Sequence, residues 1–186
     1  MMLKDRTKQL YADALRSLLG NRSFEDVRVA DLCRLSGTNR ATFYYHFRDK
    51  YDLCAWIYTQ TMEEAFRDDG RWISVEQAAA SMSRMQEEGD FYRKIFAHKS
   101  QNALWEYIAD YNMHLFENIC LQQNGAPPDE PLAFAIRYHC YACIGLTVEW
   151  LMKRRPMSAG ELAARMIGRM PADLRAVVCH VDETGL

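Results

Sequence analysis

The spacing of apolar residues is the feature of this sequence that most restricts its fold. Leu104, Ile108 and Leu115 recur at the intervals that the buried face of an amphipathic helix requires. Similar periodicity runs through most of the 186 residues, and no segment shows the period of two that marks a half-buried strand. We therefore predict an all-α fold.

The first fifty residues divide into shorter helical segments. One face of a predicted first helix carries Leu3, Leu10, Ala14 and Leu18. Further along, Ser36-Gly37-Thr38-Asn39 has the composition of a tight turn between two short helices, and Asn39 is a favourable N-cap for the second of them. Two helices joined by a short turn containing glycine form a helix-turn-helix, whose second helix can enter the major groove of DNA.

The second helix of this unit has one core face and several polar positions. Phe43 and Phe47 lie four residues apart, so we expect both to face the core. The other positions, which divide between solvent and packing, are Arg40, Thr42, Tyr44, Tyr45 and His46. Side chains of these types donate hydrogen bonds to phosphates and base edges. One of the two tyrosines could instead pack under the small domain, and His46 could bond within it.

Charge is distributed unevenly along the chain. The net charge is −2, but residues 1–53 hold ten Lys or Arg against seven Asp or Glu, whereas residues 54–186 hold thirteen against eighteen. We call residues 1–53, with a net charge of +3, the head, and residues 54–186, with a net charge of −5, the body. This difference in charge suggests that the two parts have separate functions. The near-neutral total is therefore no argument against a nucleic-acid partner.

The composition also restricts the location of the protein. No apolar run approaches the roughly 18 residues of a membrane span. The first residues lack the apolar stretch of a signal peptide, so we expect a cytoplasmic protein whose six cysteines are reduced.

Residues 24–53 carry a longer pattern in which aromatics, glycine and lysine stand at fixed places. It runs from Phe24-Glu25-Asp26-Val27 through the segment 32–47 to Lys50-Tyr51-Asp52-Leu53. This pattern resembles the DNA-binding domain of TetR/AcrR-type transcriptional regulators. The resemblance implies a helix-turn-helix DNA-binding domain at residues 1–49 and a helical effector-binding and dimerisation domain at residues 50–186. It also implies a homodimer that binds a double-stranded DNA operator.

The resemblance assigns DNA contacts residue by residue. The implied set is Arg28, Asn39, Arg40, Ala41, Thr42, Tyr44, Tyr45, His46 and Lys50. Arg40 is the main candidate for reading a base, and Lys50 at the start of the next helix is a candidate phosphate ligand. Arg28 stands where the family usually has a capping Thr or Ser, so the cap comes from elsewhere or Arg28 faces phosphate. Thr38 replaces a usual Val.

The body is expected to hold an effector site and the dimer interface. The candidates for an apolar pocket are Trp56, Met62, Met82, Met85, Trp105, Tyr111, His114, Tyr138, His139, Tyr141 and Trp150. The candidates for the dimer interface are Leu132, Ile136, Cys143, Thr147, Leu162, Met166 and Met170. A Met or aromatic residue at helical spacing is usually a core residue, and this is the alternative for each pocket candidate. The expected function is a repressor released from a palindromic operator by a small hydrophobic or aromatic effector. The alternative is a regulator of the same fold that responds to a protein partner.

Metal, redox and enzyme interpretations are weaker. Cys140 and Cys143 form a CxxC beside His139, but there is no second cysteine pair, so core thiols are favoured over a zinc site. We find no nucleophile elbow, P-loop, HExxH or dinucleotide-binding glycine motif. We therefore expect no cofactor, no metal and no enzymatic activity.

Overall fold

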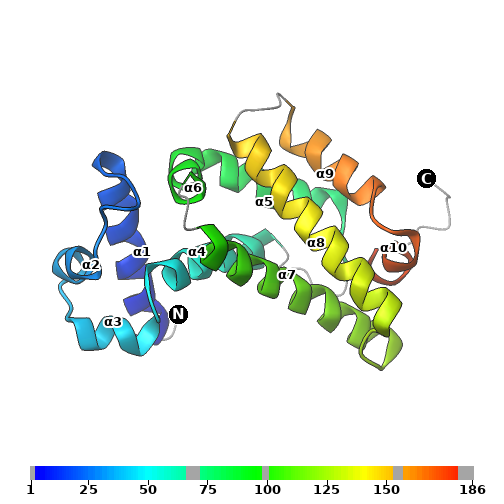
Figure 1. Cartoon of the computed structure of the whole chain (residues 1–186), viewed down its shortest axis with the longest axis horizontal. Coiled ribbons are helices and arrows are strands. Elements are labelled where there is room, and N and C mark those ends of the chain that lie inside the picture. The colour runs from blue at the N-terminus through cyan, green and yellow to red at the C-terminus, as the bar shows by residue number, and fades with distance from the viewer. Residues whose placement is uncertain (1–2, 66–71, 98–100, 153–156, 180–186) are drawn as a thin grey trace. The chain divides into compact units, whose positions relative to one another are not determined.

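The computed structural model describes residues 3–65, 72–97, 101–152 and 157–179, and within these ranges it contains helices and no strands (Figure 1). The helices are α1 (Leu3–Asn21), α2 (Val29–Ser36), α3 (Arg40–His46), α4 (Lys50–Ala65), α5 (Val75–Glu87), α6 (Gly89–Phe96), α7 (Gln101–Asn124), α8 (Glu130–Leu151), α9 (Ala159–Gly168) and α10 (Ala172–Val178). The predicted all-α class is confirmed. Among the described residues, no helix combines the length and the apolar character that crossing a membrane demands.

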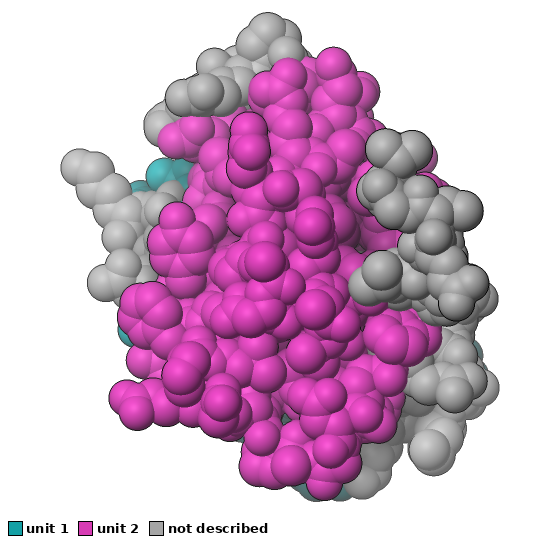
Figure 2. All heavy atoms as spheres, turned by 90° about the vertical axis from the view of Figure 1, so that its right-hand side faces the viewer, with its two compact units in different colours: residues 1–59, 88–107 teal, residues 60–87, 108–186 magenta. Residues whose placement is uncertain are grey.

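The helices group into two compact units. Figure 2 shows a face formed by unit 2, in magenta. Unit 1 comprises Met1–Thr59 and Glu88–Tyr107, and unit 2 comprises Gln60–Glu87 and Ile108–Leu186. Both units are discontinuous in sequence, because α6 and the first turns of α7 belong with the N-terminal helices. This grouping reflects packing alone, and the functional boundary between residues 49 and 50 stays a prediction.

Aromatic rings around Tyr11 form the centre of unit 1. Tyr11 lies on α1 and is fully buried. Its ring meets Phe43 of α3 edge-on, with the centroids 5.1 Å apart, and meets Phe47 at 6.2 Å. Edge-to-face pairs of this kind contribute about 0.5–1.5 kcal/mol beyond their burial. Helix α1 is therefore the surface on which α3 rests.

Polar contacts fix α6 to α1 within unit 1. Glu88, which precedes α6, accepts two hydrogen bonds from the Arg16 guanidinium, at 2.7 Å from Nε and 3.1 Å from Nη2. Lys94 of α6 donates to the carbonyl oxygen of Leu19, near the end of α1. Because the last carbonyls of a helix lack partners within the helix, the Lys94 ammonium completes the end of α1.

Unit 2 is built around α5, α8, α9 and α10 with the remainder of α7. Its apolar cluster contains Ile73, Phe116, Ile119, Cys120, Ala135, Ile136, Cys140, Met170, Leu174 and Val178. A backbone hydrogen bond of 2.8 Å from Ile73 N to Val178 O joins the segment before α5 to the end of α10. Asp129 and Ser158 cap the N-termini of α8 and α9 with their side chains, as residues of these types commonly do.

Candidate nucleic-acid interface

The turn between α2 and α3 has the geometry that its sequence predicts. Gly37 adopts the left-handed conformation, with φ at 66°, and ends α2. Glycine reaches this conformation without the steric cost that a side chain brings. Asn39 then caps α3, because Asn39 Oδ1 accepts two hydrogen bonds from Thr42, one from the backbone amide at 2.8 Å and one from the side-chain hydroxyl at 3.1 Å.

Helix α3 presents two tyrosines to solvent. Phe43 and Phe47 are buried, as their spacing predicts. Tyr44 is 51% exposed and Tyr45 is 69% exposed, so neither packs under the domain, although the sequence left this open for one of them. His46 is half-buried, and its ring meets that of Tyr45 edge-on at 5.0 Å. The outer face of α3 is thus aromatic and polar.

The start of α3 is exposed and carries the cationic side chain of Arg40. Arg40 and Ala41 are exposed, and Thr42 is half-buried against its cap. Within the described part of the chain, neither Arg40 nor Arg28 forms an ion pair. By contrast, Arg22 and Arg34 pair with Asp31 at 3.2 and 2.9 Å. Arg28 and Arg40 therefore remain available for an external anion.

The cap of α2 comes from Asp31 and not from Arg28. A guanidinium has no acceptor atom, so the Arg28 side chain cannot accept a hydrogen bond from the helix amides. Instead, the Asp31 carboxylate accepts one from the Arg28 backbone N at 3.4 Å. The exposed Arg28 side chain lies at the N-terminus of α2 and is free to reach a phosphate.

Lys50 is placed differently from its predicted role as a phosphate ligand. Its Nζ donates to three backbone carbonyls, those of Phe24 at 2.7 Å, Val27 at 3.0 Å and Glu25 at 3.1 Å. An ammonium group has three donors, so none remains for DNA. Burial lowers the pKa of Lys50. We correct its role accordingly, because Lys50 holds the loop between α1 and α2 against α4.

The N-terminus of α4 is also occupied by the protein itself. Asp49 Oδ1 accepts from the amides of Tyr51 at 2.8 Å and Asp52 at 2.9 Å. Asp52 in turn accepts from the backbone N of Arg48 at 2.9 Å. A carboxylate at the N-cap satisfies the amides that a phosphate would otherwise bind. The polar contacts with DNA are therefore expected from α3 and the start of α2.

Two family profiles match this chain. One, described as bacterial regulatory proteins of the tetR family, matches residues 12–55, which contain the helix-turn-helix. The other, described as a transcriptional regulator C-terminal region, matches residues 76–170, which is more than half of the chain. The chain belongs to the TetR family of transcriptional regulators. The matched families and relatives are regulators and not enzymes.

Relatives of this TetR-family chain cover almost its full length. The HTH-type dhaKLM operon transcriptional activator DhaS of Lactococcus lactis subsp. lactis (strain IL1403) is 25% identical over 174 residues, which are 91% of each chain. A solved structure of a dihydroxyacetone kinase operon activator, DhaS, has a TM-score of 0.61 at 19% identity, over 92% of this chain and 98% of the other. The crystal structure of a TetR transcriptional regulator from Streptococcus agalactiae 2603V has a TM-score of 0.57 at 18% identity, over 88% of this chain and 92% of the other. The solved structures support the fold.

The candidates for the effector pocket do not all come together. Trp56 and Trp105 belong to unit 1, where the Trp56 ring meets that of Phe47 at 6.1 Å. Tyr138 and Tyr141 are exposed on α8, and His114 is exposed on α7. For these five, a role in an effector pocket stays a prediction. Those inside unit 2, buried or half-buried, are Met62, Met82, Met85, Tyr111, His139 and Trp150.

The dimer-interface candidates are mostly core residues of the single chain. The buried ones are Ile136, Leu162, Met166 and Met170. A side chain that is already buried has no surface left to cover with a second copy, so these four are corrected. The half-buried ones, which retain some surface, are Leu132, Cys143 and Thr147.

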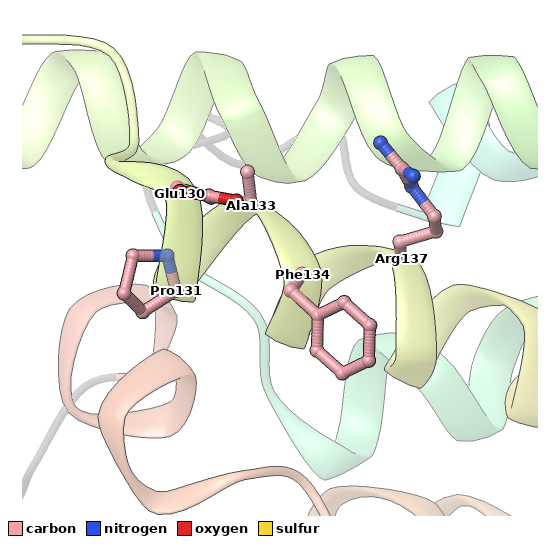
Figure 3. A pocket seen from close by; sticks show the side chains of 5 residues that line it. All are labelled: Glu130, Pro131, Ala133, Phe134 and Arg137. Atoms are coloured by element: carbon pink, nitrogen blue, oxygen red, sulfur yellow. The ribbon is translucent and has the colours of Figure 1, made fainter.

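Helix α8 instead exposes aromatic residues that were not assigned to the interface. Phe134 is 68%, Tyr138 62% and Tyr141 50% exposed, at a spacing of four and three residues that places them on one face. Beside this aromatic face, Glu130, Pro131, Ala133, Phe134 and Arg137 line an open depression of about 510 Å³. Figure 3 shows the Phe134 and Arg137 side chains projecting from α8.

The opposite side of α8 carries buried His139 and Cys140 and half-buried Cys143. His139 is buried, its Nε2 lies 3.3 Å from Cys143 Sγ, and its ring meets Phe116 edge-on at 5.6 Å. Burial lowers the pKa of His139 to about 4 and raises that of Cys140 and Cys143 to about 12. Because the thiolate is the reactive form of cysteine, these protonated thiols behave as core side chains.

Proposed function

We propose that this TetR-family chain is a sequence-specific, dimeric operator-binding regulator whose helix α3 lies in the major groove. The observation that carries the proposal is the exposed face of α3. Arg40, which forms no ion pair with any described residue, stands at its N-terminus, and Tyr44 and Tyr45 follow, on a buried base of Phe43 and Phe47. Residues near the start of a recognition helix reach base edges, and tyrosine hydroxyls reach phosphates. Such a regulator acts in the cytoplasm, where bacterial DNA is found.

The dimer is proposed to form through the aromatic face of α8, defined by Phe134, Tyr138 and Tyr141. Large exposed aromatics gathered on one helix are uncommon on a surface that faces only water, and they are enriched at interfaces. In a two-fold dimer the same patch meets itself, so α8 would pack against α8 of the second copy. Two heads on one side of the dimer would then read the halves of a palindrome.

The mode of regulation has two candidates. The first is a repressor that a small hydrophobic or aromatic effector releases from the operator, with Met82, Met85 and Tyr111 of unit 2 at the effector site. The second is a regulator of the same fold that responds to a protein partner. Separately, the named function of the Lactococcus relative as an operon transcriptional activator favours activation over repression, whichever signal controls it.

The test is selection of bound duplexes from a random pool, followed by transcription from a promoter that carries the selected operator. Enrichment of one palindrome supports operator binding, and enrichment of no sequence rules it out. Transcription that falls when the protein is added identifies a repressor, and transcription that rises identifies an activator. Release of the operator by an aromatic compound that also raises the Tm supports the small-effector mode, whereas release only by a second protein supports the partner mode.

A further inference from the structure

Three hydroxyl groups link α1 to the turn that precedes α3. Tyr11 Oη lies 2.6 Å from Thr38 Oγ1, and Thr38 Oγ1 lies 2.9 Å from Ser36 Oγ. The Ser36 hydroxyl donates to the carbonyl oxygen of Cys33 at 3.3 Å. In one consistent arrangement Tyr11 donates to Thr38, Thr38 donates to Ser36, and Ser36 donates to the carbonyl, so every hydroxyl hydrogen has an acceptor.

The network is buried at its Tyr11 end. Tyr11 is fully buried, so its hydroxyl depends on protein partners, first Thr38 and then the neighbouring Ser36 hydroxyl. A buried hydroxyl without a partner is destabilising, whereas replacing both partners by apolar groups of similar shape can be nearly neutral. Thr38 thus provides a specific bond to the core, in a turn that otherwise consists of exposed Gly37 and exposed Asn39.

Tyr11 contacts α3 at two separate places. The edge-on contacts with Phe43 and Phe47 hold the middle and the end of the helix. The hydroxyl holds Thr38, which directly precedes the N-cap residue Asn39. Since α3 has only seven residues, few hydrogen bonds of its own stabilise it, and its direction depends on tertiary contacts.

We propose that Tyr11 is a positioning residue for sequence recognition, because its hydroxyl, through Thr38, fixes where α3 begins and therefore where Arg40 reaches a base. A backbone hydrogen bond of 2.9 Å from Thr38 N to Cys33 O holds the turn to α2, and the Tyr11 hydroxyl adds the contact that ties the start of α3 to α1. A shift there changes the geometry of a base contact more than that of a phosphate contact, since base readout depends on orientation. This inference rests on the proposed role of α3 in operator recognition.

The test compares wild type with Tyr11→Phe, Thr38→Val and the double variant, on the operator selected by the wild type and on a scrambled duplex of equal length at one salt concentration. Tyr11→Phe is expected to lower operator affinity about five- to tenfold while binding to the scrambled duplex stays within about twofold, which is the scale of one hydrogen bond. Ser81→Ala is the matched control, because it removes a buried hydroxyl of α5 in unit 2.

The double variant separates positioning from stability. Thr38→Val leaves the Tyr11 hydroxyl without this partner, so of the three variants it is expected to lower the Tm most. The double variant is expected to recover the Tm but to keep the reduced ratio of operator affinity to scrambled-duplex affinity. Amide resonances of Asn39 to Thr42 should shift in Tyr11→Phe. Three results would overturn the proposal. The ratio of operator affinity to scrambled-duplex affinity could keep its wild-type value in Tyr11→Phe, or it could return to that value in the double variant. The third is an equal loss of affinity for both duplexes. If the wild type enriches no sequence, the proposed function fails instead.

Discussion

The Nζ atom of Lys50 donates to the carbonyl oxygen of Phe24 at 2.7 Å, across 26 residues of sequence. The same ammonium bonds the carbonyls of Glu25 and Val27, and it lies 4.5 Å from the centroid of the Phe24 ring. A lysine at a helix start beside a DNA-binding helix suggests a phosphate contact from sequence alone. In the folded chain, this charge stabilises the loop that connects α1 to α2.

Lys50→Met should therefore change stability rather than the electrostatics of DNA binding. Loss of the charged hydrogen bonds leaves three carbonyls to find new partners, and the free energy of unfolding should fall by about 2–3 kcal/mol. The slope of log affinity against log salt should stay at its wild-type value, whereas Arg28→Ala should reduce the slope by about one. Urea unfolding and a salt titration of operator binding measure the two effects. A reduced slope in Lys50→Met would restore its role as a phosphate ligand.

Arg40→Ala should relax recognition at one base position. A bidentate contact between arginine and guanine contributes about 1–3 kcal/mol of discrimination, so the variant should lose that amount on the selected operator and little on a duplex changed at that position. Arg34→Ala is the control, since its side chain is exposed but paired with Asp31. Equal affinity of wild type and Arg40→Ala for the selected operator would remove Arg40 from base recognition.

Tyr138→Glu should weaken the dimer without unfolding the protomer. Two carboxylates would face each other across a two-fold axis if α8 packs on its copy, and the buried charge would be unpaired. Sedimentation analysis should show a shift toward monomer, while the helical circular dichroism signal is preserved. Leu121→Glu, which alters another exposed apolar residue of unit 2, should leave the oligomeric state unchanged. A monomeric wild type, or an unaltered Tyr138→Glu dimer, would argue against this interface.

Burial of His139 should make the protein sensitive to acid. Its folded pKa of about 4 lies below the ordinary value of 6.5, so the folded state binds fewer protons than the unfolded state between these pH values. The contribution of His139 to stability is thus complete above pH 6.5 and falls as the pH drops toward 4, by about 2–3 kcal/mol in total. Urea unfolding of wild type and His139→Leu at pH 7 and 4.5 isolates this effect, because both proteins share the same carboxylates. Identical pH dependence would contradict it.

The fold of the head follows from local patterns, and this is why the sequence predicts so much of it. Phe43 and Phe47 are four apart on a short helix, so their shared face can be read directly. Gly37 and Asn39 have chemistries that fit a left-handed turn and a helix cap. The first helix is only partly predicted, because Ala14 and Leu18 of the expected core face are buried whereas Leu10 is 43% exposed. The core face also includes Tyr11 and Leu15, which are fully buried.

The contacts that the sequence could not predict join residues that are distant along the chain. The acceptors of Lys50 are backbone carbonyls, which every residue carries and no pattern distinguishes. Helix α8 is apolar on more than one side, so periodicity alone cannot tell that Ile136 faces the core while Tyr138 faces solvent. The burial of Tyr11 is not predicted, because the expected core face of the first helix includes Leu10 instead; only once that burial is known does its phenol call for a hydrogen-bond partner.

The bonds from Arg16 to Glu88 and from Lys94 to Leu19 affect how such regulators could be recombined. A chimera that joins residues 1–49 of this chain to the body of another regulator would separate Arg16 from its carboxylate partner and α1 from the ammonium at its end. The stability of the grafted helices would then depend on which residues of the new body lie at the positions of Glu88 and Lys94. A transferable module therefore needs the segment Glu88–Tyr107 as well, and specificity swaps in this chain require two exchanged pieces instead of one.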